Sequence, residues 1–176
     1  MNSSLSVKVV IGVVICLTLG FLSGMSTVDA IANWYSGLIK PSFNPPNWIF
    51  GPVWTVLYAF MGIVIGRAWH SGDTKGIKLF AVQFILNLLW SPVFFLMHQP
   101  LLALVIIITL WTMLIMCIRY WWRVDRLSAY LFVPYILWVS FATVLNASIV
   151  LLNWYTVVLS YEVIFFHMII LQCINL

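Results

Sequence analysis

The stretch LFAVQFILNLLWSPVFFLMHQPLLALVIIITLWTMLIMCI (Leu79–Ile118) contains no Asp, Glu, Lys or Arg. A helix needs about 20 apolar residues to cross the hydrocarbon core of a bilayer, so this stretch is long enough for two spans. The segment MHQP (Met97–Pro100) divides it, because it is polar and ends in a residue that stops a helix. The stretch therefore predicts two consecutive membrane helices.

Three further runs lack charged residues, namely residues 9–28, 41–66 and 127–161. The chain has 176 residues, of which 64% are hydrophobic and 7% are charged, whereas a soluble domain carries about 25% charged residues. The composition therefore excludes a soluble protein. Helices are expected because a helix satisfies its own backbone hydrogen bonds in lipid. We predict an all-α polytopic membrane protein, a bundle of five transmembrane helices at about residues 7–27, 47–69, 77–97, 101–120 and 128–153.

The predicted bundle occupies residues 1–153, and residues 154–176 form an apolar C-terminal tail. Glu162 and His167 make this tail a poor membrane span, so we expect an interfacial helix or a partial sixth helix. The apolar stretch of the first helix exceeds the roughly 7–15 residues of a signal-peptide core, which favours a retained helix. Two glycine pairs, Gly20–Gly24 and Gly62–Gly66, have the spacing of small-residue packing motifs. They could form a dimer face or pack helices within one subunit.

Basic residues are concentrated on one side of the predicted bundle. That side carries Lys8, Arg67, Lys75, Lys78, Arg119, Arg123 and Arg126, and the other side carries Lys40 alone. Cytoplasmic loops are the ones enriched in Lys and Arg. The distribution predicts a cytoplasmic N-terminus and an outward-facing first loop, as expected in a bacterial inner membrane. The net charge of +4 is thus a topology signal, and no basic patch indicates a nucleic acid partner.

Aromatic and amide residues recur at helical spacing on one face of three predicted spans. They are Trp54 and Tyr58 in the second span, Gln83, Asn87, Trp90, Ser91 and Phe94 in the third, and Trp138, Ala142, Leu145 and Asn146 in the fifth. Small polar side chains often hold membrane helices together, which is one interpretation. Aromatic walls with a few polar groups also line ligand cavities, and these would suit a flat, largely apolar ring.

The first loop is stiffened by Pro41, Pro45 and Pro46, so it has little conformational freedom to lose when a ligand binds. This predicts a pre-ordered lid. Catalytic signatures are missing: the sequence has no Ser-His-Asp set, metal-binding cluster, phosphate loop or dinucleotide motif. The spans also lack the midplane charges typical of ion-coupled transporters. We expect no metal and no obligatory cofactor.

Three segments resemble the TspO/MBR family, which includes tryptophan-rich sensory proteins and the mitochondrial translocator protein. They are WYSGLIKPSFNPPNWIFGPVWTVLYAFMG (Trp34–Gly62), LNLLWSPVFF (Leu86–Phe95) and VPYILWVSFATVLNASIVLLN (Val133–Asn153). The resemblance implies a five-helix bundle, often a homodimer, with a pocket near the first loop that binds porphyrins. The family's cholesterol motif cannot be complete after the fifth helix, because the chain has no Lys or Arg beyond Arg126.

The resemblance also implies which residues bind the ligand. Trp54 and Trp138 match the paired pocket tryptophans of the family, and Trp121 matches a ligand-facing tryptophan at the end of the fourth helix. Further matches are Tyr35, Pro45 and Pro46 in the lid, Asn87 and Trp90 in the third helix, and Ala142, Leu145 and Asn146 in the fifth. Tyr58 and Phe94 are also predicted to bind the ligand, because they lie on the aromatic helical faces described above.

The leading hypothesis is a membrane sensor or receptor that holds a tetrapyrrole, a porphyrin or haem-type ligand, at the mouth of the bundle. One alternative is an enzyme that degrades porphyrin with light and oxygen, in which Trp54 and Trp138 would be the catalytic candidates. Another alternative is a transporter of tetrapyrroles or other small molecules.

Overall fold

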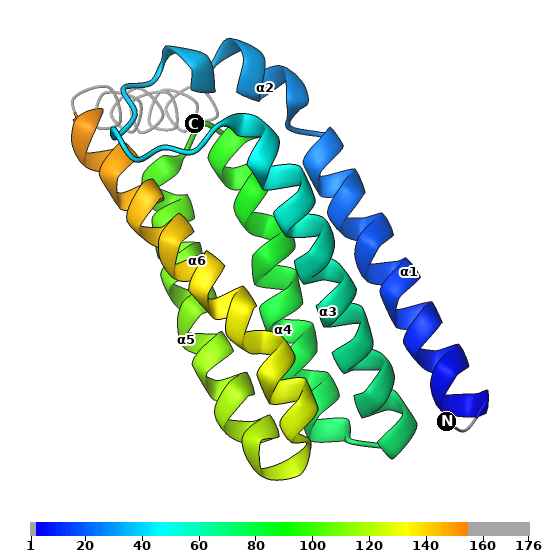
Figure 1. Cartoon of the computed structure of the whole chain (residues 1–176). Helices are drawn as coiled ribbons and strands as arrows, with labels where there is room; N and C mark the ends of the chain where they lie inside the picture. Colours follow the sequence, from blue (N-terminus) through cyan, green and yellow to red (C-terminus); the bar gives the residue numbers. More distant parts are fainter. Residues whose placement is uncertain (1–2, 155–176) are drawn as a thin grey trace, which may run out of the picture.

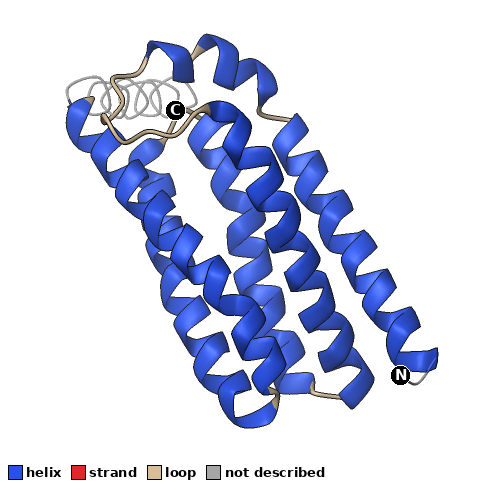
Figure 2. Ribbon diagram, in the orientation of Figure 1, coloured by secondary structure: helices blue, strands red, loops and turns tan. Residues whose placement is uncertain are grey.

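The computed structural model describes residues 3–154, so the predicted tail lies outside the described residues except for Trp154. The elements are α1 (Ser3–Met25), α2 (Val28–Asn33), η1 (Tyr35–Gly37), η2 (Asn47–Ile49), α3 (Phe50–Ser71), α4 (Thr74–Ser91), η3 (Pro92–Leu96), α5 (Pro100–Val124) and α6 (Arg126–Leu152). Between residues 3 and 154 the chain forms no strand, which confirms the predicted all-α class (Figure 2). Five helices are long and apolar enough to cross a membrane, as predicted.

The five long helices lie side by side in an elongated bundle (Figure 1). α1 packs along α3 at one edge, α5 packs against both α4 and α6, and α3 also contacts α6. The connection of residues 26–49, with α2, η1 and η2, covers one end of the bundle, which we call the loop end. The opposite end carries the N-terminus and the two short turns before α4 and α6, and we call it the N-terminal end.

Glycines allow α1 and α3 to approach at backbone distance. A Cβ atom on Gly62 would lie 2.3 Å from Cα of Val13, and one on Gly12 would lie 2.4 Å from the carbonyl oxygen of Gly62. Gly66 meets the α1 backbone in the same way. The pair Gly62–Gly66 therefore packs helices within one subunit, which was one of its two sequence interpretations.

Two turns at the N-terminal end are held by side chains. α3 ends at Ser71 and is capped by Gly72, whose φ of 69° is in the left-handed region that favours glycine. Asp73 then caps α4, because its carboxylate accepts a hydrogen bond from the backbone N–H of Gly76 at 2.9 Å. Arg67 donates two hydrogen bonds, of 2.7 and 2.9 Å, to the carboxylate of Asp125 in the turn between α5 and α6. These contacts tie α3 to both neighbouring turns.

Two prolines lie inside the spans, and only one of them coincides with a change in helix type. Pro92 ends the regular part of α4, and η3, a π-helical turn, continues the span as far as Leu96. A π-turn changes the direction of the following side chains, and such turns are frequent at functional sites. Pro134 lies inside α6. The break predicted at residues 97–100 is present, since α5 begins at Pro100.

Candidate functional site

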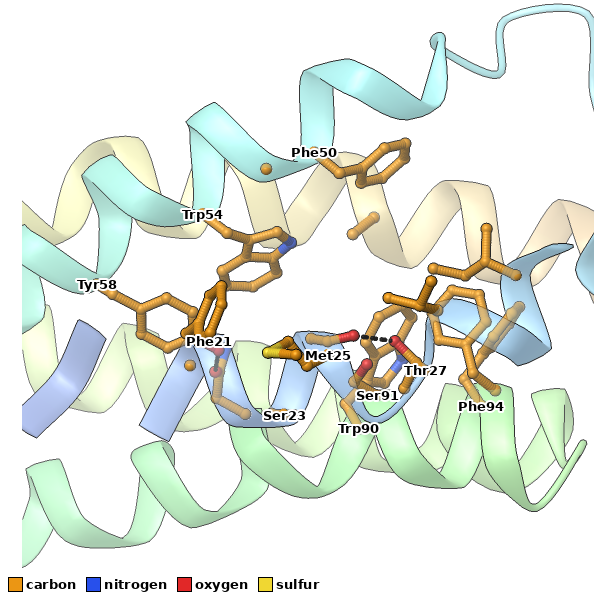
Figure 3. A pocket seen from close by; sticks show the side chains of 18 of the residues that line it. Phe21, Ser23, Met25, Thr27, Phe50, Trp54, Tyr58, Trp90, Ser91 and Phe94 are labelled. Atoms are coloured by element: carbon orange, nitrogen blue, oxygen red, sulfur yellow. Dashed lines mark hydrogen bonds between the residues drawn. The ribbon is translucent and has the colours of Figure 1, made fainter. Parts of the chain in front are cut away.

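A cavity of about 790 Å³ lies at the loop end, enclosed by α1, α3, α4 with η3, and α6. The first loop contributes residues of α2 and η1 to its wall. Most of the lining is apolar, and Figure 3 shows Phe50 and Trp54 of α3 facing the same space as Trp90 of α4 and Met25 of α1. The cavity therefore lies within the bundle, at the end covered by the first loop.

Aromatic rings form much of the cavity wall. Trp54 lies 5.5 Å from Tyr58 between ring centroids, and Trp90 stacks on Phe94 at 5.3 Å with an angle of 27° between their planes. The spacing of these residues on α3 and α4 brings them to one side of each helix, as predicted. The indole N–H of Trp54 has no hydrogen-bond partner within residues 3–154, and its nitrogen points into the cavity in Figure 3. It is therefore a donor left free by the described residues, in a wall that is mostly apolar.

The amide of Asn87 is bonded within the protein. Its oxygen accepts a hydrogen bond from the hydroxyl of Tyr58 at 2.8 Å, and its nitrogen donates to the hydroxyl of Tyr135 at 2.9 Å. Tyr135 in turn donates to the side-chain oxygen of Gln83 at 3.1 Å. Three helices, α3, α4 and α6, are joined by this buried network. For Asn87, the structure supports the helix-packing interpretation, although the residue also lines the cavity.

Asn146 on α6 is bonded in the same manner. Its oxygen accepts the indole N–H of Trp90 at 3.2 Å, and its nitrogen donates to the backbone carbonyl of Pro100 at 2.9 Å. The amide thereby fixes the orientation of the Trp90 ring at the cavity wall. Ala142 and Leu145 of α6 also line the cavity.

Side-chain hydrogen bonds order the first loop and tie it to the end of α6. Tyr35 is buried and lines the cavity, and its hydroxyl donates to the side-chain oxygen of Asn44 at 3.0 Å. Burial raises the pKa of the Tyr35 phenol, so it stays neutral and can donate. Asn153 at the end of α6 accepts the backbone N–H of Ile39 at 3.0 Å and donates to the Ile39 carbonyl at 2.9 Å. Pro45 and Pro46 lie in this loop but do not line the cavity.

Trp138 and Trp121 are not brought to the cavity wall. Trp138 packs edge-on against Phe50 at 5.7 Å, and Phe50 is the residue that lines the cavity. The indole N–H of Trp138 is buried and has no hydrogen-bond partner among the described residues. Trp121 lies at the N-terminal end, 1% exposed and packed against Phe132 at 5.0 Å. α5 carries Trp121 to the end opposite the first loop, so it is a core residue in this structure.

Two contributions to the site were missed by the sequence analysis. The last two turns of α1, with Phe21, Ser23 and Met25, form one side of the cavity. α1 is apolar on all sides, so periodicity gave no signal for this face. Asn153 was not assigned a role either, although an amide at the end of a span is a signal for a contact with a loop.

The chemistry available in the cavity is stacking and limited hydrogen bonding. No group of three His, Cys, Asp or Glu residues within the described part of the chain could hold a metal ion. None of the described residues that line the cavity carries a charge. The arrangement is suited to binding a flat, apolar molecule.

Comparisons with known proteins agree with this architecture. The sequence profile of the TspO/MBR family matches residues 12–152. The chain is 42% identical over 144 residues to the Tryptophan-rich protein TspO of Chlorobaculum tepidum, covering 79% of this chain and 91% of that protein. It is 42% identical over 149 residues to the protein of the same name from Archaeoglobus fulgidus, with 83% and 97% coverage. It is also 38% identical over 119 residues to the human Translocator protein, with 64% and 70% coverage.

Proposed function

Because this chain belongs to the TspO/MBR family of integral membrane proteins, we propose that it is a membrane sensor that binds a tetrapyrrole in the loop-end cavity. The observation that carries the proposal is the aromatic wall of Trp54, Tyr58, Trp90 and Phe94 along a hollow of about 790 Å³. Ligand cavities commonly have about 300–1,000 Å³, and aromatic rings bind flat rings by offset or edge contacts.

The polar edge of the ligand is expected to face the first loop. Porphyrins such as protoporphyrin IX carry carboxylates on one edge, and Lys40 is the one Lys or Arg at the loop end of the described chain. Its ammonium group lies 4.8 Å from the ring centroid of Tyr35, which lines the cavity. The free N–H of Trp54 would supply a second donor. Asn87 and Asn146 would shape the wall, since their amides are already bonded to the protein.

The experiment is a titration of the detergent-solubilised protein with protoporphyrin IX in the dark, followed by porphyrin absorbance. We compare wild type with Trp54→Leu and with the matched control Trp48→Leu, a tryptophan of the same end that is 74% exposed and outside the cavity wall. An aromatic contact contributes about 1 kcal/mol beyond its buried area, so we expect roughly fivefold weaker binding for Trp54→Leu. Equal affinities for all three proteins would contradict the proposal.

Illumination of the same samples tests the degrading-enzyme alternative. Two oxidisable rings, Trp54 and Tyr58, are adjacent in the wall, which is the specific observation in its favour. Light- and oxygen-dependent loss of porphyrin absorbance in wild type, abolished in Trp54→Phe while dark binding persists, would support an enzyme. Stable absorbance in wild type would favour the sensor.

The orientation in the membrane is a proposal as well. The seven basic residues at the N-terminal end, against Lys40 at the loop end, favour a cytoplasmic N-terminus in an inner membrane. A reporter enzyme that is active only outside the cytoplasm, inserted in the loop of residues 38–46, is expected to be active. The same reporter at the N-terminus is expected to be inactive, and the reverse result would overturn this orientation.

A further inference from the structure

A second hollow lies on the outside of the bundle, in the half nearer the N-terminal end. It is a groove of about 280 Å³ between α1 and α4, with α3 as its floor. Ile11 and Ile15 form the α1 side, Phe84 and Ile85 form the α4 side, and Gly66 lies at the floor. No residue lines both this groove and the loop-end cavity. The two are therefore separate sites.

The groove is apolar and open to the surface that faces lipid. Ile15 and Ile85 on its two rims are exposed, Ile85 by 56%. All three contributing helices are membrane spans, so water does not fill this space. An empty groove would leave its lining atoms without contacts on one side. A hydrocarbon chain of the bilayer supplies those contacts.

Two lysines stand at the N-terminal end of the groove. Lys8 precedes Ile11 and Ile15 on the same face of α1, and its ammonium lies 5.1 Å from the ring centroid of Trp69, which lines the groove. Lys78 precedes Ala81 and Ile85 by three and seven residues, which places all three on one face of α4. The basic groups therefore cap the groove from both sides.

Neither lysine forms a salt bridge with an acidic residue of the described part of the chain. The ion pair between Arg67 and Asp125 is the one salt bridge formed within residues 3–154. Asp73, the acid nearest in sequence to Lys78, accepts hydrogen bonds from Gly76 and from Tyr120 on α5. Residues 3–154 thus supply no ion pair to the positive charge at the mouth of the groove.

We propose that this groove binds a phospholipid with an anionic headgroup from the leaflet at the N-terminal end. One acyl chain lies along the groove between α1 and α4, and the phosphate lies between Lys8 and Lys78. Trp69, 47% exposed, lies at the level of the headgroups, where tryptophan is enriched in membrane proteins. Basic pockets between membrane helices are known to bind anionic lipid headgroups in this way.

The test uses the purified full-length chain, titrated in detergent with phosphatidylglycerol or with phosphatidylcholine of the same acyl chains, and measures bound lipid by native mass spectrometry. Each lysine near an anionic lipid surface contributes about a fivefold gain in affinity. We expect the double variant K8Q/K78Q to bind phosphatidylglycerol roughly 25-fold more weakly than wild type. The matched control is Lys75→Gln, because Lys75 lies over the ring of Tyr120 on α5, away from the groove.

A second variant tests the groove itself. Ala81→Phe is at an exposed position of α4 and fills the groove without changing charge, so we expect it to weaken binding of both lipids. Circular dichroism melting confirms that each variant is folded. The proposal is overturned if K8Q/K78Q binds like wild type, or if Lys75→Gln weakens binding equally. It is also overturned if Ala81→Phe changes the oligomeric state seen by native mass spectrometry and leaves lipid binding unchanged. That result would mean that a second copy of the chain covers the groove.

Discussion

The buried amide of Asn87 is expected to contribute measurably to the stability of the bundle. Its side chain is 5% exposed and forms hydrogen bonds to the hydroxyls of Tyr58 and Tyr135. Hydrogen bonds between membrane helices contribute on average about 0.6 kcal/mol and at most about 1.7 kcal/mol each. Replacing Asn87 by Ala removes two such bonds, so we expect the free energy of unfolding to fall by about 1–3 kcal/mol.

A double-mutant cycle isolates one of the two bonds. The variants Asn87→Ala and Tyr58→Phe each break the 2.8 Å bond between these residues, so the double variant loses it only once. We expect a coupling energy of about 0.6–1.7 kcal/mol. The assay is equilibrium unfolding in mixed micelles of dodecyl maltoside and SDS, followed by circular dichroism.

The matched control is Asn47→Ala, an exposed amide that lines the same cavity. It has no side-chain hydrogen bond within residues 3–154, and we expect it to change the free energy of unfolding by less than about 0.5 kcal/mol. A coupling energy near zero, or equal effects of Asn87→Ala and Asn47→Ala, would show that the buried network does not hold the helices together.

Three further predictions concern other contacts. Replacing Asn153 by Ala removes both hydrogen bonds to Ile39, so we expect faster hydrogen exchange at the Ile39 amide in mass spectrometry, with the melting of the long helices unchanged. Arg67 lowers the pKa of Asp125 below its ordinary 3.8, helped by a hydrogen bond from a neighbouring serine. The ion pair therefore stabilises the fold by about 1 kcal/mol at neutral pH. This stabilisation is present above about pH 4 and is lost as the pH falls through the pKa of Asp125 in the folded protein. We expect the unfolding curves of wild type and Asp125→Asn to converge in acid. Gly62→Val forces the backbones of α1 and α3 apart, so we expect the melting temperature to fall by several degrees. An unchanged melting curve would contradict this prediction.

The spans and their class follow from the sequence alone, because hydrophobicity and backbone hydrogen bonding are local properties. A run such as Leu79–Ile118 is too long and too apolar for any soluble element, and its polar break lies where α5 begins. Helical periodicity likewise predicted that Trp54 shares a face with Tyr58, and Trp90 with Phe94. Those four rings line one cavity.

Only the tertiary structure decides what each face meets. Asn87 and Asn146 have the same sequence signature whether they bind a ligand or another helix, and the packing of α3, α4 and α6 pairs both with protein groups. Trp121 and Trp54 are both tryptophans of membrane spans, yet α5 carries Trp121 to the end opposite the cavity. Asn153 meets Ile39 across 114 positions of sequence. Periodicity states which residues share a face, whereas contacts between distant segments depend on how the helices are arranged in the bundle.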